Sequence, residues 1–155
     1  MNLLKKEFNF AISHRLEDHK GLCNNVHGHN YKLFVTVKRT DNKLITKDEN
    51  ISSEGMVVDF KDLKNIVNTR IIDKLDHAFV FNKESNVCED IANYLVEKIN
   101  QKIYPLSCKT TAENMSKCIL EELNKYFILN NIQLKCIEIE LYETESSMAI
   151  YKKWK

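Results

Sequence analysis

Three histidines in the first third of the chain have a spacing that suits metal binding. His27 and His29 lie two residues apart in an alternating polar and apolar stretch, so on a strand both side chains leave the same face. His14 lies in the apolar phase of the preceding alternating stretch, and strands that follow each other in sequence are usually neighbours. The pattern therefore predicts three imidazoles converging on one apolar face. A zinc ion with three histidine ligands and one open position would compensate for their burial.

The alternative to a metal site is that each histidine is a buried side chain hydrogen-bonded to the backbone. That alternative would be preferred for a single histidine, but a pair on one strand together with a third in phase favours a metal. His19 lies in a polar loop, so we expect it to be solvated rather than to act as a fourth ligand. Gly28, between two of the predicted ligands, allows the chain or a ligand to approach closely on the other face.

Cys23 lies in the loop that leads into the predicted metal site, four residues before His27. A thiol beside a divalent cation or a protonated histidine loses its proton more easily and can act as a base or a nucleophile. Two alternatives remain open from spacing alone: a fourth zinc ligand, or a loop thiol without a role. The other cysteines are expected to be small buried hydrophobic residues, and they stand at positions 88, 108, 118 and 136.

Two further carboxylates stand in positions that could serve chemistry. Asp76 and His77 follow a helical stretch, and a carboxylate beside an imidazole can orient a general acid or base. The two would act together only in a turn, because neighbouring residues on a strand point apart; taken alone, they favour a helix-terminal aspartate and a surface histidine. Glu143 occupies the apolar phase of a strand, where a carboxylate is rare unless it is paired or binds something. It could accept two hydrogen bonds from an amide-rich ligand, or the strand could end before it and leave it in solvent.

The elements that must position these residues can be inferred from hydrophobic periodicity. Alternation predicts strands around residues 8–14 and 27–37, and again around 137–143 and 148–152. Between them, Asp59 caps a helix whose apolar positions recur to Leu75, a second helix covers 89–100, and Thr110-x-x-Glu113 forms a capping box for a third. Strands and helices in separate blocks predict an α+β fold with a four-stranded antiparallel sheet and helices on one face.

Length and composition exclude several classes of protein. The 155 residues correspond to a single domain, 1–155. With 23 basic and 22 acidic residues the net charge is +1, which gives no electrostatic case for a nucleic-acid partner. The apolar run at residues 78–81, which no other run exceeds, is far shorter than the ~20 residues of a membrane span, and no signal peptide is recognisable at the N-terminus. The five cysteines form no CxxC pair and favour a reduced, cytoplasmic protein.

These residues together resemble one known family. Cys23-x3-His27-Gly28-His29 is similar to the C-x3-H-G-H motif of the 6-pyruvoyltetrahydropterin synthase and 6-carboxytetrahydropterin synthase family. Further blocks match in the family's order and cover nearly the whole chain: Phe10 to Leu16, Gly55 to Phe60, Leu75 to His77, Thr111 to Asn114, and Glu143-Thr144. Two features depart from the usual pattern. The segment 82–109 is longer than in compact bacterial members, and Thr110 replaces a common proline.

The resemblance implies a tunnelling fold, ββααββ, in which three subunits join their sheets into a barrel and two trimers stack as a homohexamer. The active sites would lie between subunits. His14, His27 and His29 would bind zinc, which would hold and polarise the side-chain oxygens of a dihydropterin triphosphate. Cys23 would be the proton-transferring base, with Asp76 and His77 assisting. Glu143 would bind the amino-pyrimidine edge of the pterin, a role that would explain its place on an apolar face.

Two activities of the family start from 7,8-dihydroneopterin triphosphate. One eliminates triphosphate and gives 6-pyruvoyltetrahydropterin. The other also releases acetaldehyde and gives 6-carboxy-5,6,7,8-tetrahydropterin, on the route to queuosine and other deazapurines; we expect this lyase activity for a bacterial chain. The rival classes are a non-catalytic metal-binding module, which would normally supply four protein ligands, and a zinc hydrolase, which would need a carboxylate base such as that of HExxH.

Overall fold

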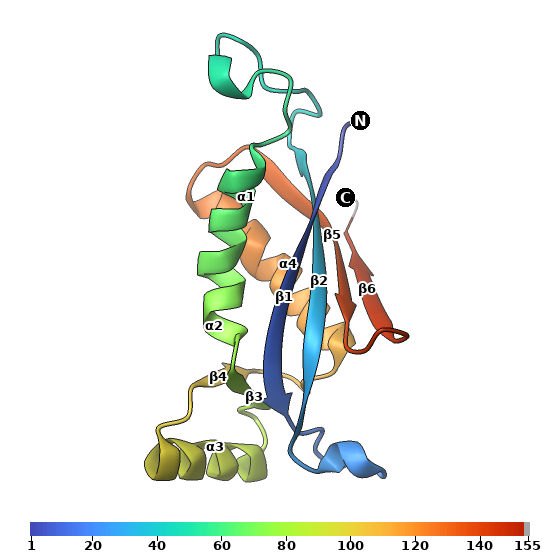
Figure 1. Ribbon diagram of the computed structural model, residues 1–155, viewed down its shortest axis with the longest axis vertical. Coiled ribbons are helices and arrows are strands. Elements are labelled where there is room, and N and C mark those ends of the chain that lie inside the picture. Colours follow the sequence, from blue (N-terminus) through green and yellow to red (C-terminus); the bar gives the residue numbers. More distant parts are fainter. Residues whose placement is uncertain (154–155) are drawn as a thin grey trace.

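The computed structural model describes residues 1–153, and its framework is a six-stranded sheet with the strand order β4-β3-β1-β2-β5-β6 (Figure 1). The strands are β1 Leu4–His14, β2 His27–Arg39, β3 Ala78–Asn82, β4 Ile103–Leu106, β5 Leu134–Tyr142 and β6 Met148–Lys152. The helices are α1 Phe60–Val67, α2 Asp73–Leu75, α3 Asn86–Ile99 and α4 Ala112–Leu129, and a π-helical turn, Asn68–Ile72, makes α1 and α2 continuous. No helix among the described residues is long and apolar enough to cross a membrane.

The four predicted antiparallel strands are confirmed. β1 pairs with β2, β2 with β5, and β5 with β6, all antiparallel. Periodicity did not predict β3 and β4, two short strands that extend the sheet: β3 pairs in parallel with β1, and β4 pairs in parallel with β3. All five residues of β3 are buried, so its sequence shows no alternation. A short apolar run of this kind is not distinguishable by pattern from a turn or a helix end.

Alternation of side chains separates a covered face of the sheet from an open one. Phe8, Phe10 and Ile12 of β1 and Leu33 and Val35 of β2 belong to the main core, together with buried residues of α1 and α4. The opposite face carries charges, and there Lys5 contacts both Glu138 and Glu140. The helices α1, α2 and α4 therefore cover the face whose phase includes the three histidines.

Helix α3 packs elsewhere. It contacts the other phase of β3, where Phe79 and Phe81 form a second small core with Cys88 and Ala92. Ala78 and Val80, which alternate with these phenylalanines, belong to the main core. The α3 helix thus adds cover on the opposite side at one end of the sheet, and it begins at Asn86, three residues earlier than predicted, with Ser85 as its cap.

The predicted start of α1 is confirmed, whereas the predicted cap of α4 is displaced by one residue. Asp59 caps α1 as expected, its carboxylate accepting from the amide of Lys61 at 2.7 Å. The capping box at Thr110 was wrong by one residue: Thr111 caps α4, accepting from the amide of Asn114 at 3.3 Å. Thr110 is instead fully buried and donates its hydroxyl to the carbonyl of Arg15. Both threonines could cap, and only burial of the first decides between them.

Candidate metal and catalytic site

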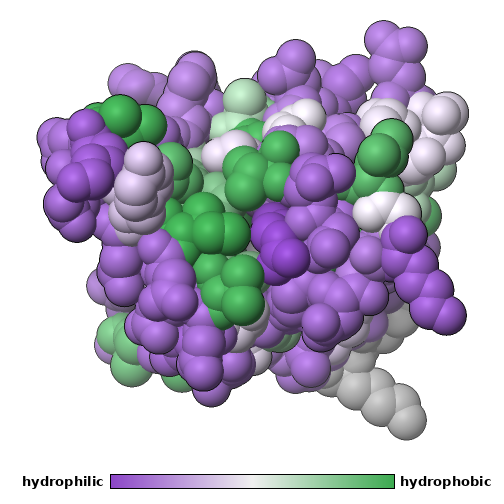
Figure 2. All heavy atoms as spheres, turned by 90° about the horizontal axis from the view of Figure 1, so that it is seen from below, coloured by the Kyte–Doolittle hydropathy of each residue, from purple (hydrophilic) through white to green (hydrophobic). Residues whose placement is uncertain are grey.

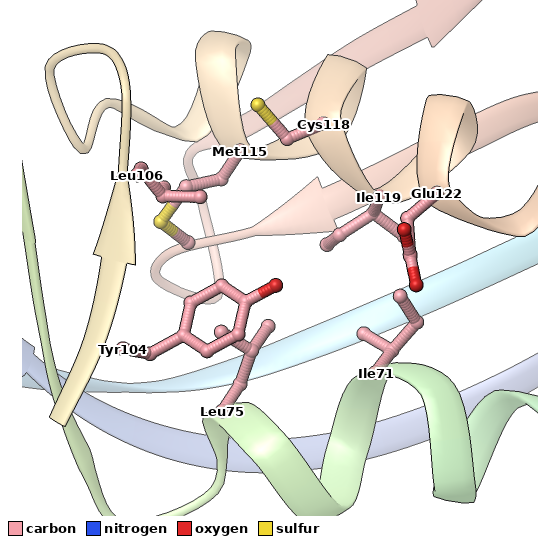
Figure 3. A pocket seen from close by; sticks show the side chains of 8 residues that line it. All are labelled: Ile71, Leu75, Tyr104, Leu106, Met115, Cys118, Ile119 and Glu122. Atoms are coloured by element: carbon pink, nitrogen blue, oxygen red, sulfur yellow. The ribbon is translucent and has the colours of Figure 1, made fainter.

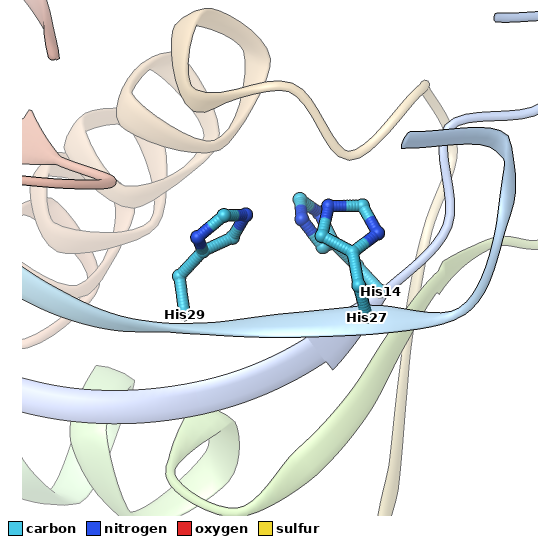
Figure 4. Close-up of side chains that lie close together, drawn as sticks. All are labelled: His14, His27 and His29. Atoms are coloured by element: carbon cyan, nitrogen blue, oxygen red, sulfur yellow. The ribbon is translucent and has the colours of Figure 1, made fainter. Parts of the chain in front are cut away.

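The three predicted histidines meet where β1 ends and β2 begins (Figure 4). His14 is directly opposite His27 in the antiparallel register, and His29 is opposite Ile12. The ring centroid of His14 lies 4.6 Å from that of His27 and 5.4 Å from that of His29. One ligand nitrogen from each ring lies within 4.8 Å of the other two, and the group could hold a metal ion. The pairing register of two strands is therefore enough to assemble it.

The hydrogen bonds of these rings fit a metal ligand set. Nδ1 of His14 donates to the carbonyl of Thr110 at 3.0 Å, and Nδ1 of His27 donates to the carbonyl of Asn25 at 2.8 Å, since a carbonyl can only accept. The three Nε2 atoms are buried and have no hydrogen-bond partner among the described residues. Burial also lowers the pKa of His14, which favours its neutral form. Three buried imidazole nitrogens close together and without hydrogen-bond partners suit a cation with histidine ligands.

Gly28 allows the strands to meet closely between the ligands. A Cβ atom at this position would lie 2.6 Å from the carbonyl oxygen of Ile12, closer than any side chain tolerates. Any other residue would push β2 away from β1 beside His27 and His29. The close approach expected at Gly28 is made by the backbone of β1.

Glu143 is next to the histidine cluster, although β5, the strand that was expected to include it, ends one residue earlier. β5 ends at Tyr142, and the amide of Glu143 donates to Ser147 in the turn that leads to β6. Its Oε1 lies 3.6 Å from Nε2 of His29, and its side chain is 27% exposed. It also borders an open surface pocket that includes Asn30 and Lys32. The carboxylate is therefore neither buried in the core nor directed into solvent.

Tyr31 holds Glu143 in place, and sequence reasoning missed this role. The Tyr31 hydroxyl donates to Oε2 of Glu143 at 2.8 Å, and the tyrosine itself is 1% exposed. Burial and the neighbouring carboxylate raise the pKa of Tyr31, so the hydroxyl keeps its proton as donor. The only signal in the sequence was that Tyr31 follows His29 in the same strand phase.

Cys23 lies in a short 3₁₀ turn, Leu22–Asn24, and is half-buried. Its carbonyl accepts from the amide of Leu16 at 2.9 Å, which ties it to the chain just beyond β1. Among the described residues, the group that could hold a metal consists of the three histidines and does not include Cys23. This arrangement disfavours the fourth-ligand alternative and leaves the base and the passive thiol.

Asp76 and His77 form the turn that their joint action requires. Oδ2 of Asp76 lies 2.9 Å from Nδ1 of His77, and His77 has a left-handed φ of 60°. Asp76 Oδ1 accepts from the amide of Ala11 at 2.9 Å, a bond that is the main reason why the pKa of Asp76 is lowered. The His77 side chain is 82% exposed. Within residues 1–153 no hydrogen bond or ion pair joins this pair to the histidine cluster.

A second hollow lies between the helices, away from the histidines (Figure 3). Ile71 and Leu75 face Met115 and Ile119 across it, and Tyr104 and Leu106 of β4 also line it. Its one carboxylate, Glu122, is paired with Arg70. Its lining is that of a packing gap in the core, without a group of polar residues that could perform chemistry.

Comparison with known proteins agrees with this geometry. The 6-pyruvoyl tetrahydropterin synthase family model matches residues 3–153. The 6-carboxy-5,6,7,8-tetrahydropterin synthase of Haemophilus influenzae is 36% identical over 149 residues, which cover 96% of this chain and 97% of the relative. The protein of the same name from Aquifex aeolicus is 26% identical over 166 residues, covering 96% of each chain.

Solved structures show the same fold. An uncharacterised protein from Wolinella succinogenes superposes with a TM-score of 0.75 at 19% identity, covering 98% of both chains. The 6-pyruvoyl tetrahydropterin synthase of Caenorhabditis elegans superposes with a TM-score of 0.61 at 21% identity, covering 98% of this chain and 95% of that one. Since the family model spans nearly all of the described residues, the chain belongs to the 6-pyruvoyl tetrahydropterin synthase family.

Proposed function

We propose that the chain is a zinc-dependent lyase that converts 7,8-dihydroneopterin triphosphate into 6-carboxy-5,6,7,8-tetrahydropterin, with release of triphosphate and acetaldehyde. The observation that carries the proposal is the convergence of three histidine Nε2 atoms beside the Glu143 carboxylate, none of them with a hydrogen-bond partner among the described residues. The relatives from Haemophilus influenzae and Aquifex aeolicus, both named for this product, support the choice of reaction. The route to queuosine would be its metabolic setting. Its five free cysteines are typical of a reducing compartment such as the cytoplasm.

His14, His27 and His29 would hold the zinc through Nε2, with two of their Nδ1 atoms fixed by backbone carbonyls. When bound, zinc acts as a Lewis acid that polarises the side-chain oxygens of the substrate. The protein's own contribution is to hold three imidazoles close together, because the pairing register of β1 and β2 fixes where they lie. Three protein ligands leave a coordination position for substrate, as in catalytic rather than structural zinc sites.

Cys23 would transfer the proton, with Asp76 and His77 assisting. The Asp76 carboxylate orients the His77 ring and is itself held by the backbone of β1. Because no hydrogen bond or ion pair within residues 1–153 joins this pair to the histidine cluster of its own chain, we propose that each active site combines residues of two subunits. The exposed imidazole of His77 is accessible to such a neighbour.

The assembly would be built from trimers, and a homohexamer is expected. β4 and β6 are the edges of an open sheet, and unpaired edges favour pairing with another chain. Apolar side chains are exposed as well, and Figure 2 shows hydrophobic patches among hydrophilic groups at the end of the molecule that includes α3. Multi-angle light scattering should give a mass that is a multiple of three chains. A stable monomer at micromolar concentration would contradict this assembly.

Glu143 would anchor the pterin, whose amino group and ring N–H can donate side by side to one carboxylate. We expect Glu143→Ala to lower kcat/KM strongly, because each hydrogen bond to a charged group is worth about 1.5–3 kcal/mol. Glu140→Ala is the matched control, since its carboxylate contacts Lys5 on the open face of the sheet. Steady-state kinetics and metal content should be measured for both variants. Equal kinetics in the two, or zinc loss in Glu143→Ala alone, would remove the anchor role.

The second candidate function is 6-pyruvoyl tetrahydropterin synthesis, which is favoured by the name of the matching family model. Incubation with 7,8-dihydroneopterin triphosphate separates the two reactions, because only the proposed one yields acetaldehyde. We expect acetaldehyde and triphosphate in equal amounts. Triphosphate without acetaldehyde would assign the second function, and no conversion would leave a metal-binding module without catalysis.

A further inference from the structure

The segment 82–109, which includes α3 and β4, contacts both parts of the chain that the proposed function makes catalytic. Figure 1 places α3 at the same end of the molecule as the turn of residues 22–24. We infer that this segment is a positioning element: it fixes the loop that carries Cys23 and, separately, the turn that carries Asp76 and His77. The inference rests on the proposed function for the catalytic roles of Cys23, Asp76 and His77, whereas the contacts are observed in the structure.

The first contact is made to a buried carboxylate. Glu17, at the start of the Cys23 loop, is 7% exposed. Asn82 Nδ2 donates to its Oε1 at 2.6 Å, and the Cys88 thiol lies 3.8 Å from its Oε2. Lys109 Nζ donates to the backbone carbonyl of the same residue at 2.9 Å. A buried carboxylate is costly without such donors, so Glu17 can stay inside only while these residues of the segment remain in place.

Further hydrogen bonds connect the residues that precede Glu17 to the turn that carries Cys23. Leu16, the neighbour of Glu17, donates its amide to the carbonyl of Cys23 at 2.9 Å. Arg15 Nε donates to the carbonyl of Asn24 at 2.6 Å, and its Nη1 lies 3.9 Å from the sulfur of Cys88. The two sides of the Cys23 loop are thus joined next to the residue that Asn82 holds. A displacement of Glu17 would therefore be transmitted to Cys23.

The second contact fixes the turn at Asp76 and His77. Lys102 Nζ donates to the carbonyls of Asp73 and Asp76, at 2.7 Å each. Gln101 Nε2 donates to the carbonyl of His77 at 3.0 Å. The left-handed backbone of His77 is unfavourable for a residue with a side chain, so it persists only where its surroundings impose it. These donors lie directly before β4 and satisfy the carbonyls of that turn.

The test replaces Asn82 by Leu in the zinc-loaded full-length protein. Two quantities are measured: kcat and KM for 7,8-dihydroneopterin triphosphate, and the rate at which iodoacetamide alkylates Cys23, followed on its peptide by mass spectrometry. We expect kcat to fall by up to about 10²-fold, because a small misplacement of a catalytic group can lower the rate by this much. KM and zinc content should change little. The alkylation rate of Cys23 should rise several-fold. Glu17→Gln keeps an oxygen acceptor for Asn82, so its kcat and its Cys23 alkylation rate should stay close to those of the wild type.

Two further variants complete the test. Asn124→Leu is the matched control, because it removes a half-buried amide that bonds the backbone of Cys136 in both directions at 2.9 Å, away from the loop. It should lower stability without changing kcat or Cys23 alkylation. Lys102→Met changes an exposed residue, and it should lower kcat while leaving Cys23 alkylation unchanged.

The outcomes separate this inference from the proposed function. If Asn82→Leu leaves Cys23 alkylation as in the control, the positioning role of the first contact is wrong, whatever the turnover. If Lys102→Met keeps full kcat, the second contact has no positioning role. If the wild-type protein does not convert the substrate, the proposed function fails, and the alkylation rates of Asn82→Leu and Asn124→Leu still decide whether the segment fixes the Cys23 loop.

Discussion

Cys23→Ala is expected to lower kcat by about 10²–10⁴-fold, the typical contribution of a general acid or base, while the protein stays folded and keeps its zinc. The metal should remain because the ligand group of the described residues is made of the three histidines without Cys23. Cys118→Ala is the matched control. It also removes a half-buried free thiol, but on α4, and it should leave turnover unchanged.

The same variant distinguishes the three roles that are possible for this thiol. If Cys23 is the base, its loss lowers kcat and leaves zinc affinity unchanged. If Cys23 is a metal ligand, its loss lowers zinc affinity and activity together. If Cys23 is a passive loop residue, its loss changes neither. Zinc content by elemental analysis, measured on the same preparation as kcat, decides among them, and only the first result agrees with the proposed mechanism.

His27→Ala is expected to abolish both stable zinc binding and turnover. Two imidazoles would remain, and removal of even an outer hydrogen-bond partner of a metal ligand costs about 10–100-fold in affinity, so loss of a ligand should cost more. The affinity is measured by competition with a chelator. His19→Ala is the control, since His19 lies outside the cluster and accepts a hydrogen bond from the amide of Gly21.

Thermal unfolding gives a readout of the same site that does not depend on turnover. Zinc that binds only the folded protein stabilises it by about 2.7 kcal/mol when its free concentration is 100 times Kd. Added zinc should therefore raise the Tm of the metal-stripped wild type and of His19→Ala, and have little effect on His27→Ala. Full zinc occupancy in His27→Ala, or an equal rise in Tm, would contradict the assignment of the ligands.

The convergence of the three histidines could be predicted because the side-chain period of a strand allows only two faces. Once His14 and His27 are placed in the apolar phase of neighbouring strands, a shift by one residue would expose every apolar partner of the same phase. Glu143 shows the limit of this reasoning. Its phase was right, yet the strand ends one residue earlier, and Tyr31 rather than strand geometry places the carboxylate near His29.

Contacts between distant segments could not be predicted from a local pattern. Asn82 and Glu17 are 65 positions apart, and neither belongs to a motif that would pair them. The parallel strand β3 was missed because burial on both faces removes the alternation. The choice between Thr110 and Thr111 as helix cap depends on which of them is buried beside β1, a property of the folded chain.

The proposed zinc-dependent lyase activity is tested most directly by acetaldehyde release from 7,8-dihydroneopterin triphosphate by metal-stripped protein, measured as zinc is added back. Release should be proportional to bound zinc, with a maximum at about one zinc per chain, as expected for one three-histidine site in each chain. One acetaldehyde should be released for each triphosphate. Triphosphate release without acetaldehyde, or a rate independent of zinc, would contradict the proposed activity.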